Sequence, residues 1–120
     1  MGLTTITAIV GKGKNSIEVD FLVDSGATYS LLTENVWREL GLKPMRTMKF
    51  SLADGTIIKR QISETRFEYQ GLYGTTPVIL GEDKDKALLG VFTLEGLGLM
   101  LNPFTRELIP MKMMLAKISK

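Results

Sequence analysis

Short runs of β-branched and apolar residues, each ended by a turn signal, constrain the fold of this chain more than any other feature. The runs 3–10 and 16–23 flank two glycines, which is typical of a β-hairpin. Asp54 and Gly55 form an Asp-Gly pair between two alternating runs, the strongest short-range signal for a second hairpin. Further runs of this kind cover 29–32, 48–52, 56–60, 62–69, 76–80, 87–89, 97–101 and 107–109.

Two short helices are predicted between these runs. Thr33 precedes the first helix, and residues 92–96 form the second. The mixed-charge run 82–86 is predicted to be a solvated loop. A chain of 120 residues is long enough for one domain with its own core. We therefore predict an all-β fold with one domain over 1–110, followed by a Met-rich tail over 111–120.

The absence of histidine and cysteine excludes several kinds of chemistry. Without cysteine there is no disulfide, thiolate zinc site or thiol nucleophile, and without histidine there is no Ser-His or Cys-His dyad. Acid–base catalysis would have to use carboxylates, lysine or tyrosine. A net charge of +2 gives no reason to expect nucleic acid or a membrane as partner. No apolar run approaches the roughly 18 residues of a membrane span, and we expect a cytoplasmic protein.

An acidic turn after an apolar strand is the strongest candidate for catalysis. The run FLV at 21–23 leads directly into DSGAT at 24–28. A carboxylate next to a core strand costs free energy unless it is hydrogen-bonded or functional, which makes Asp24 the candidate catalytic residue. Gly26 lets the backbone curl so that its N–H groups face the carboxylate. The alternative is an ordinary Asp-Ser-Gly turn that caps a strand.

A second motif, Leu88-Leu89-Gly90, follows a long excursion of the chain. Two apolar residues and a glycine suit a strand that packs beside the acidic turn, with no side chain at Gly90 to obstruct the approach. Taken alone, the motif is equally typical of an ordinary core strand.

Together, the turn at Asp24 and the motif at 88–90 resemble the retropepsin-like aspartic proteases, the single-domain relatives of pepsin found in retroviruses and in cellular genomes. The resemblance covers 6–109 and includes the order of the parts: hairpin, apolar strand into the acidic turn, glycine-bearing hairpin, second hairpin, then the apolar motif before a short helix. The run LLGVFTLEGLGL at 88–99 is similar to prokaryotic members in particular. The helix that carries Trp37 is also more typical of cellular members than of retroviral ones.

The resemblance implies a retropepsin-like closed β-barrel that pairs as a homodimer and acts as an aspartic endopeptidase. In such enzymes two carboxylates share one proton around a water molecule, because like charges about 3 Å apart cannot both ionise. The chain has a single Asp-Ser-Gly, so the second catalytic Asp24 has to come from a second copy. The mechanism needs no metal and no cofactor. The implied partners are a second copy and an extended peptide or protein substrate.

The resemblance also implies roles for other residues. Ser25 would brace the acidic turn across the dimer, and Gly26 would approach the substrate backbone. The residues expected to support the turn are Ser25, Gly26, Ala27 and Thr28. A flap that closes over the substrate is expected over Leu52, Ala53, Asp54, Gly55, Thr56 and Ile57. Apolar side-chain pockets are expected to be lined by Val23, Ala27, Ile79 and Leu88. The alternatives are an ordinary exposed hairpin for the flap and core positions for the pocket residues.

Two departures from the family pattern have structural consequences. Val91 stands where many retroviral members have an arginine that ties the following helix to the acidic turn. The helix is then expected to be held by packing of Phe92 and Leu94. The Met-rich tail over 111–120 extends past the usual end of the family, where it would either knit the dimer or bind another molecule.

Two alternatives to a general endopeptidase remain open from the sequence. The first is a non-catalytic, dimeric peptide-binding or scaffold domain on the same fold. The intact Asp-Ser-Gly favours the enzyme, because a binding module has little reason to keep a costly pair of carboxylates. The second is an enzyme whose only substrate is its own precursor.

Overall fold

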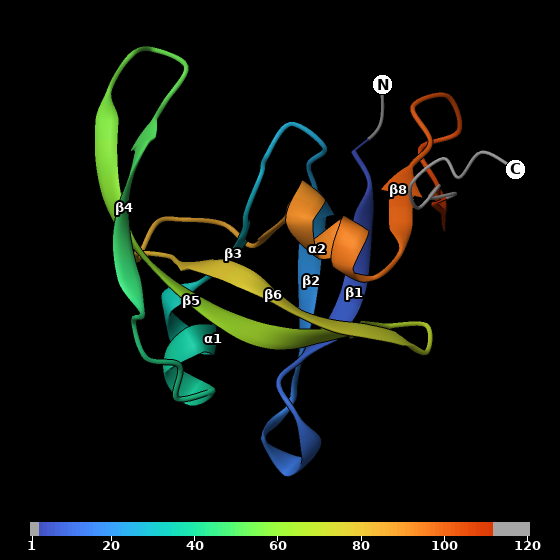
Figure 1. The fold of residues 1–120 in the computed structure, drawn as a ribbon, viewed down its shortest axis with the longest axis horizontal. Helices are drawn as coiled ribbons and strands as arrows, with labels where there is room; N and C mark the ends of the chain where they lie inside the picture. Colours follow the sequence, from blue (N-terminus) through green and yellow to red (C-terminus); the bar gives the residue numbers. More distant parts are fainter. Residues whose placement is uncertain (1–2, 112–120) are drawn as a thin grey trace, which may run out of the picture.

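Antiparallel strands build most of the molecule, which consists of a seven-stranded sheet, a two-stranded sheet and short helices (Figure 1). The structure is a computed structural model and describes residues 3–111. The strands are β1 Thr5–Val10, β2 Ile17–Val23, β3 Ser30–Leu32, β4 Arg46–Ser51, β5 Ile57–Tyr69, β6 Leu72–Leu80, β7 Leu88–Leu89, β8 Leu99–Leu101 and β9 Leu108–Pro110. The helices are the 3-10 turn η1 Gly13–Asn15 and the α-helices α1 Glu34–Glu39 and α2 Val91–Gly96. The all-β class predicted from the sequence is confirmed.

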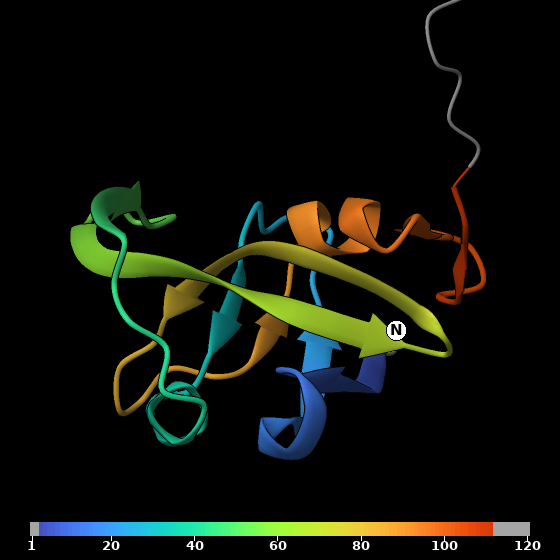
Figure 2. The ribbon, with the colours of Figure 1, turned by 60° about the horizontal axis from the view of Figure 1, so that its bottom comes forward.

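The large sheet curls back on itself. Its strand order is β1-β2-β7-β3-β6-β5-β4. Strand β1 pairs along its whole length with β2 and also, through Ile9 and Val10, with β5. Because β1 has partners on both sides, the sheet encloses a core rather than lying flat (Figure 2).

The core follows the two-residue period of the strands. In β2, Val19, Phe21 and Val23 are buried, while Asp20 between them is exposed. Phe21 contacts Phe67 of β5 with the ring centroids 5.8 Å apart. The apolar residues identified in the sequence therefore face the inside of the curl, and the polar residues between them face solvent.

Strand β5 is longer than the sequence predicts. The runs 56–60 and 62–69 were expected to belong to different hairpins, but they form one strand of 13 residues. Gln61 pairs with Thr47 of β4 and with Leu80 of β6. Gln61 is exposed and is paired on both sides, so no turn interrupts the chain there. One strand therefore passes from the first hairpin into the main sheet without a break.

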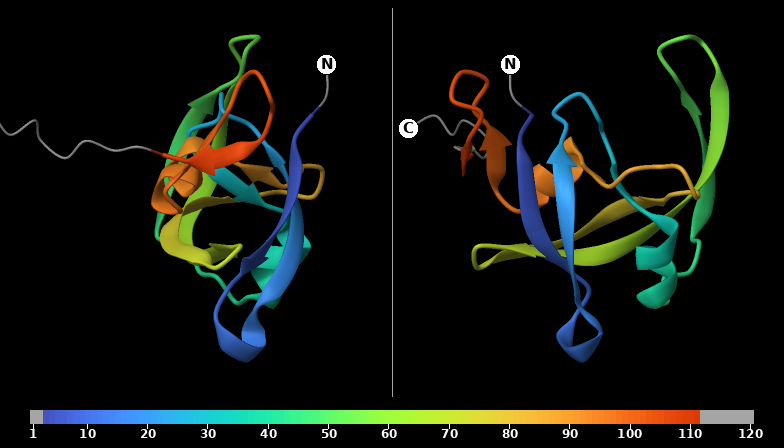
Figure 3. Two further views of the ribbon diagram at one scale, coloured as in Figure 1. Left: turned by 90° about the vertical axis from the view of Figure 1, so that its right-hand side faces the viewer. Right: turned by 180° about the vertical axis from the view of Figure 1, so that it is seen from behind.

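The turn of the β4–β5 hairpin, the loop after β2 and helix α2 lie toward the same end of the molecule (Figures 1 and 3). Helix α1 follows Thr33 as predicted, and α2 begins at Val91, one residue before the expected start. Each α-helix has six residues, so none in 3–111 is long enough to cross a membrane.

Candidate active site

Asp24 lies at the end of β2, where the chain leaves the sheet. Its backbone N–H donates a hydrogen bond to the Leu89 carbonyl of β7 at 3.0 Å. The Gly26 N–H donates to Asp24 Oδ1 at 2.9 Å, and the Ala27 N–H donates to the Asp24 carbonyl at 3.1 Å. The Gly26 N–H therefore holds the half-buried carboxylate, as expected from the glycine at this position, while the bond from Ala27 closes the turn.

Strand β7 separates the two strands that carry the Asp24 loop, by which we mean residues 24–29. It pairs in parallel with β2, with Leu88 opposite Leu22, and antiparallel with β3, with Leu88 opposite Leu31. The motif at 88–90 is far from Asp24 in sequence but lies between the two ends of its loop. A strand inserted there fixes the spacing of β2 and β3, and so the base of the Asp24 loop.

Gly90 crosses the Asp24 loop where no side chain fits. A Cβ atom at this position would lie 2.5 Å from the Tyr29 carbonyl oxygen and 2.8 Å from that of Ala27. Beyond the crossing, the Val91 N–H donates to the Ala27 carbonyl at 2.8 Å, and the Phe92 N–H donates to the Thr28 carbonyl at 3.0 Å. The first turn of α2 is thus bonded directly to the Asp24 loop.

A chain of buried hydroxyls lies behind this contact. The Gly90 N–H donates to Ser30 Oγ at 2.9 Å, Ser30 Oγ lies 2.5 Å from Thr93 Oγ1, and Thr93 Oγ1 lies 2.9 Å from Thr76 Oγ1. Packing of Phe92 and Leu94 was expected to hold α2, and both contribute: Leu94 is buried, and the partly exposed Phe92 ring meets Tyr29 edge to face at 5.3 Å. The expectation is incomplete, because it did not include the hydrogen bonds. The sequence signal that could have indicated the hydroxyls is a threonine within an apolar helical turn.

A cavity of about 460 Å³, called the groove below, lies beside the Asp24 loop. One wall comes from the loop and the strands around it: Gly26, Ala27, Thr28, Tyr29, Leu31, Ile79 and Leu88. The opposite wall comes from the β4–β5 hairpin and the loop after β6: Phe50, Ser51, Leu52, Ile58, Arg60 and Asp85. The groove is a largely apolar slot bounded by the Asp24 loop on one side and a hairpin on the other.

The groove includes most of the predicted pocket residues but not all of them. Ala27, Ile79 and Leu88 line it, whereas Val23 belongs to the core and is 7% exposed. Val23 points inward because it continues the buried alternation of Val19 and Phe21. The prediction for Val23 is therefore wrong, and its stated alternative, a core position, is what the structure has.

The predicted flap residues form the exposed turn of the β4–β5 hairpin. The Leu52 N–H donates to the Thr56 carbonyl at 2.7 Å, and Gly55 has a φ of +87°, which favours glycine. Asp54 Oδ1 accepts the Thr56 N–H at 2.9 Å. Hydrogen bonds from Thr56 hold the pKa of the Asp54 carboxyl below its usual value of 3.8.

Of the six residues predicted for the flap, only Leu52 lines the groove. Phe50 and Ile58, which were not among the predicted residues, line it from the two strands of the hairpin. The alternation of side chains along a strand was the available signal, because Phe50 lies two positions before Leu52 and therefore on the same face.

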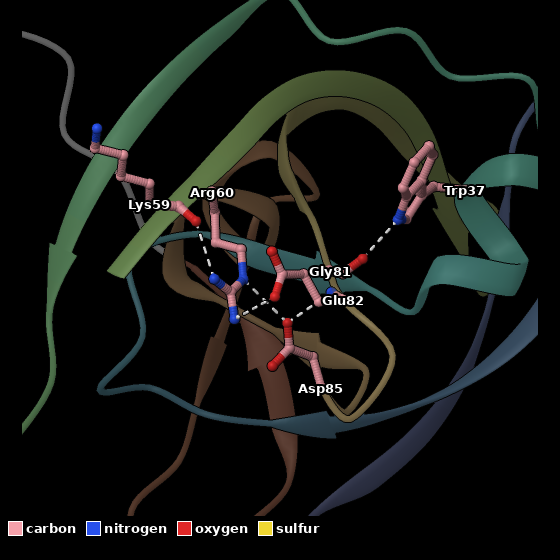
Figure 4. Close-up of polar contacts among 6 residues, drawn as sticks. All are labelled: Trp37, Lys59, Arg60, Gly81, Glu82 and Asp85. Atoms are coloured by element: carbon pink, nitrogen blue, oxygen red, sulfur yellow. Dashed lines mark hydrogen bonds and ion pairs between the residues drawn. The ribbon is translucent and has the colours of Figure 1, made fainter. Parts of the chain in front are cut away.

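Arg60 and Asp85, which both line the groove, form an ion pair (Figure 4). Arg60 Nε donates to Asp85 Oδ2 at 3.2 Å, and Glu82 Oε1 lies 3.6 Å from Arg60 Nη2. Asp85 Oδ2 also accepts the Glu82 N–H at 2.7 Å. The run 82–86 was predicted to be wholly solvated. That is wrong for Asp85, whose side chain is 26% exposed, because Arg60 draws it against β5.

Arg60 and Asp85 also line a second cavity, of about 820 Å³, so the ion pair borders both cavities. Trp37 of α1 also lines this second cavity and donates from Nε1 to the Gly81 carbonyl at 2.8 Å (Figure 4). Within residues 3–111, no three acidic side chains gather closely enough to hold a metal ion.

The Met-rich tail was assigned to 111–120. The Met111 N–H donates to the Gly98 carbonyl at 2.8 Å, which continues the path of β9. The remainder of the tail lies outside the described residues, so the expectation that it knits a dimer or binds another molecule stays a prediction.

Comparisons with known proteins identify the family and the fold to which this chain is similar. Residues 6–92 match a family model described as aspartyl protease. No curated protein matches the chain significantly. The fold is similar to that of the EIAV protease complexed with the inhibitor HBY-793, with a TM-score of 0.63 and 20% identity, over 81% of this chain and 89% of that chain.

Two cellular structures are also similar. A retropepsin-like aspartic protease from Rickettsia conorii has a TM-score of 0.57 and 27% identity, over 84% of this chain and 77% of that chain. The retroviral protease-like domain of Ddi1 from Leishmania major has a TM-score of 0.60 and 15% identity, over 92% of this chain and 89% of that chain. The retropepsin-like fold predicted from the sequence is thereby confirmed.

Proposed function

The chain belongs to the aspartyl protease family, and on that premise we propose that it is an aspartic endopeptidase that works as a homodimer. One observation carries the proposal. Asp24 follows a buried strand, its carboxylate accepts the Gly26 N–H, and residues 26–29 of its loop line an apolar groove. Each chain supplies one such carboxylate, and the reaction needs two.

The proposed chemistry uses only the two Asp24 carboxylates and water. One carboxylate accepts a proton from the water as its oxygen bonds to the peptide carbonyl carbon. The other carboxyl donates its proton to the carbonyl oxygen, which gives a neutral tetrahedral intermediate. When the C–N bond breaks, the leaving nitrogen takes up a proton from the dyad and the hydroxyl proton returns to it, which restores the singly protonated pair.

The substrate is proposed to be an extended peptide that lies along the groove. The β4–β5 hairpin can add main-chain hydrogen bonds to an extended strand, as in other cases where a peptide joins a sheet edge. The apolar lining from Ala27, Ile79 and Leu88 suits apolar substrate side chains. By this proposal, residues 52–57 act as the flap.

Replacing Asp24 tests the proposal directly. The Asp24→Asn variant should lose cleavage of an unstructured protein mixture, and pepstatin should inhibit the wild type. Asp20→Asn is the matched control, since Asp20 is an exposed aspartate on β2, the strand that leads to Asp24, and its carboxylate bonds only the Thr7 hydroxyl among residues 3–111. Cleavage that survives in Asp24→Asn would remove Asp24 from the mechanism. A folded wild-type dimer that cleaves nothing from acidic to neutral pH would favour a peptide-binding domain.

Mixing the two forms tests whether the site is shared. If each site needs Asp24 from both chains, an equal mixture of wild type and Asp24→Asn that has exchanged subunits should keep about one quarter of the wild-type activity. Independent sites would keep half. Specific activity should also fall on dilution below the dimer dissociation constant, because mass action separates the chains.

A further inference from the structure

Three buried hydroxyls connect helix α2 to the base of the Asp24 loop. The chain runs from Thr76 on β6 through Thr93 on α2 to Ser30 on β3, and it ends at the Gly90 N–H. Thr93 and Ser30 are fully buried, and Thr76 is 6% exposed. Buried polar groups destabilise a core unless their hydrogen bonds are satisfied, so this arrangement tolerates little displacement of its members.

At Gly90, this series of hydroxyls is linked to the turn that carries the Asp24 carboxylate by short backbone contacts. Gly90 packs on the carbonyl groups of Ala27 and Tyr29, with no room for a Cβ atom. The Leu89 carbonyl accepts the Asp24 N–H, and the Ala27 carbonyl accepts the Val91 N–H. Residues 89–91 therefore contact both ends of the turn that presents the carboxylate, and the hydroxyls fix where those residues lie.

We propose that Thr93, together with Ser30 and Thr76, positions the Asp24 carboxylate for catalysis. The inference rests on the proposed protease function. Thr93 is a positioning residue and not a catalytic one, because it acts on Asp24 through Ser30 and the backbone of residues 89–92. Val91, at the start of α2, has no charge with which to bind the Asp24 loop. In this protein the buried hydroxyls hold α2 against that loop.

Replacing Thr93 by valine removes the hydroxyl and keeps the shape. A carboxylate displaced by a fraction of an ångström loses alignment with its water and its partner, so kcat should fall about tenfold or more in Thr93→Val. The KM should change less than twofold, because Thr93 does not line the groove. The pH profile of kcat/KM should also shift, and Thr93→Ser should restore both kcat and the profile.

Two control variants separate positioning from general loss of stability. Thr65 lies opposite Thr76 on β5 and is 7% exposed, but it is not one of the three bonded hydroxyls. Thr65→Val should therefore keep wild-type kcat and pH profile. Ser30→Ala and Ser63→Ala form the second pair. Both serines are buried, and Ser63 Oγ donates to the Lys43 carbonyl at 2.8 Å, away from the Asp24 loop. Only Ser30→Ala should lower kcat.

The outcome distinguishes this inference from the proposed function. If Thr93→Val is destabilised but keeps wild-type kcat and pH profile, the positioning role is overturned and the protease function stands. If the wild type cleaves nothing, the amide chemical shift of Gly26, whose N–H bonds Asp24 Oδ1, provides the readout. A Gly26 signal that moves in Thr93→Val and not in Thr65→Val supports positioning. An unmoved signal overturns it.

Discussion

The two walls of the groove are held in different ways. The Asp24 loop is fixed from behind by buried bonds, including the fully buried Ser30 and Thr93 and the tight crossing at Gly90. The β4–β5 hairpin opposite is exposed throughout its turn. Its ion pair with the loop after β6, between Arg60 and Asp85, lies within this same wall, and the two side chains are 15% and 26% exposed.

This difference matches what each wall has to do in a protease. Chemistry needs the carboxylate held to within a fraction of an ångström, which buried and fully bonded polar groups provide. Substrate entry needs an element that opens at little cost, and such elements have few buried contacts. The comparison therefore predicts that changes behind the Asp24 loop affect stability and kcat, whereas changes in the hairpin affect KM and local motion.

The largest effect is expected at the crossing of Gly90 over the Asp24 loop. In Gly90→Ala the new methyl group would lie within 2.5 to 2.8 Å of two backbone carbonyl oxygens. Backbone cannot give way as a side chain does, so we expect a loss of about 3 kcal/mol or more in the free energy of unfolding. Urea denaturation measures the stability, and cleavage of a peptide substrate should fall with it.

Gly71→Ala is the matched control for that variant. Gly71 has a φ of +81° at the β5–β6 turn, with no atom near enough to meet a Cβ. The substitution should cost about 1 kcal/mol of backbone strain and leave kcat unchanged. If Gly90→Ala were as stable as Gly71→Ala, the Asp24 loop would be able to move away from the new methyl group. The loop would then not be the rigid wall of the groove.

A smaller effect is expected at the ion pair that holds the hairpin. In Arg60→Met the hairpin loses its charged link to Asp85, and we expect amide hydrogen exchange in residues 51–57 to become faster. The KM should rise about fivefold, equivalent to about 1 kcal/mol for a partly buried pair. A double-mutant cycle with Asp85→Asn isolates the pair from other effects of Arg60, since asparagine still accepts the Glu82 N–H.

The pair of Arg38 with Glu34 provides the comparison for that cycle. It lies within α1, with Arg38 Nη2 2.8 Å from Glu34 Oε2 and the side chains 63% and 36% exposed. Its coupling should be about 0.3–0.5 kcal/mol, with no change in KM. High salt should weaken the Arg60 coupling less than this one, because Arg60 is the more buried. Equal couplings would mean that the ion pair does not restrain the hairpin.

The features that the sequence predicted depend on local signals. The Asp-Gly pair at 54–55 specifies its turn, and the glycine at 90 indicates a close approach of two backbones. The two-residue alternation in β2 predicts the strand. It also indicates that Val23 faces the core on the same side as Phe21. Because the inward side of β2 is the core, Val23 packs there and does not line the groove.

Features that depend on distant residues were not predictable. Ser30 and Thr93 are 63 positions apart, and Thr76 is 17 positions from Thr93, so no local pattern joins the three hydroxyls. Asp85 belongs to a charged run that is otherwise exposed, and only the course of β5 brings Arg60 against it. In each case the polar group is specified by tertiary packing, whereas the turns are specified by their own residues.

The smallest effect is expected from the Asp54 carboxylate in the hairpin turn. Hydrogen bonds from Thr56 lower its pKa below 3.8, so the ionised form supports the turn. Because the folded pKa is the lower one, this support is complete above pH 3.8 and is lost as the pH falls through the folded value. Asp54→Asn keeps an acceptor for the Thr56 N–H and removes the titration, whereas Asp54→Ala removes both. Hydrogen exchange of the Thr56 amide should therefore be protected at neutral pH in the wild type and in Asp54→Asn, and unprotected in Asp54→Ala. On acidification the wild type alone should lose part of its protection relative to the intrinsic exchange rate. Equal protection in all three proteins would show that the backbone bond from Leu52 to Thr56 suffices to hold the turn.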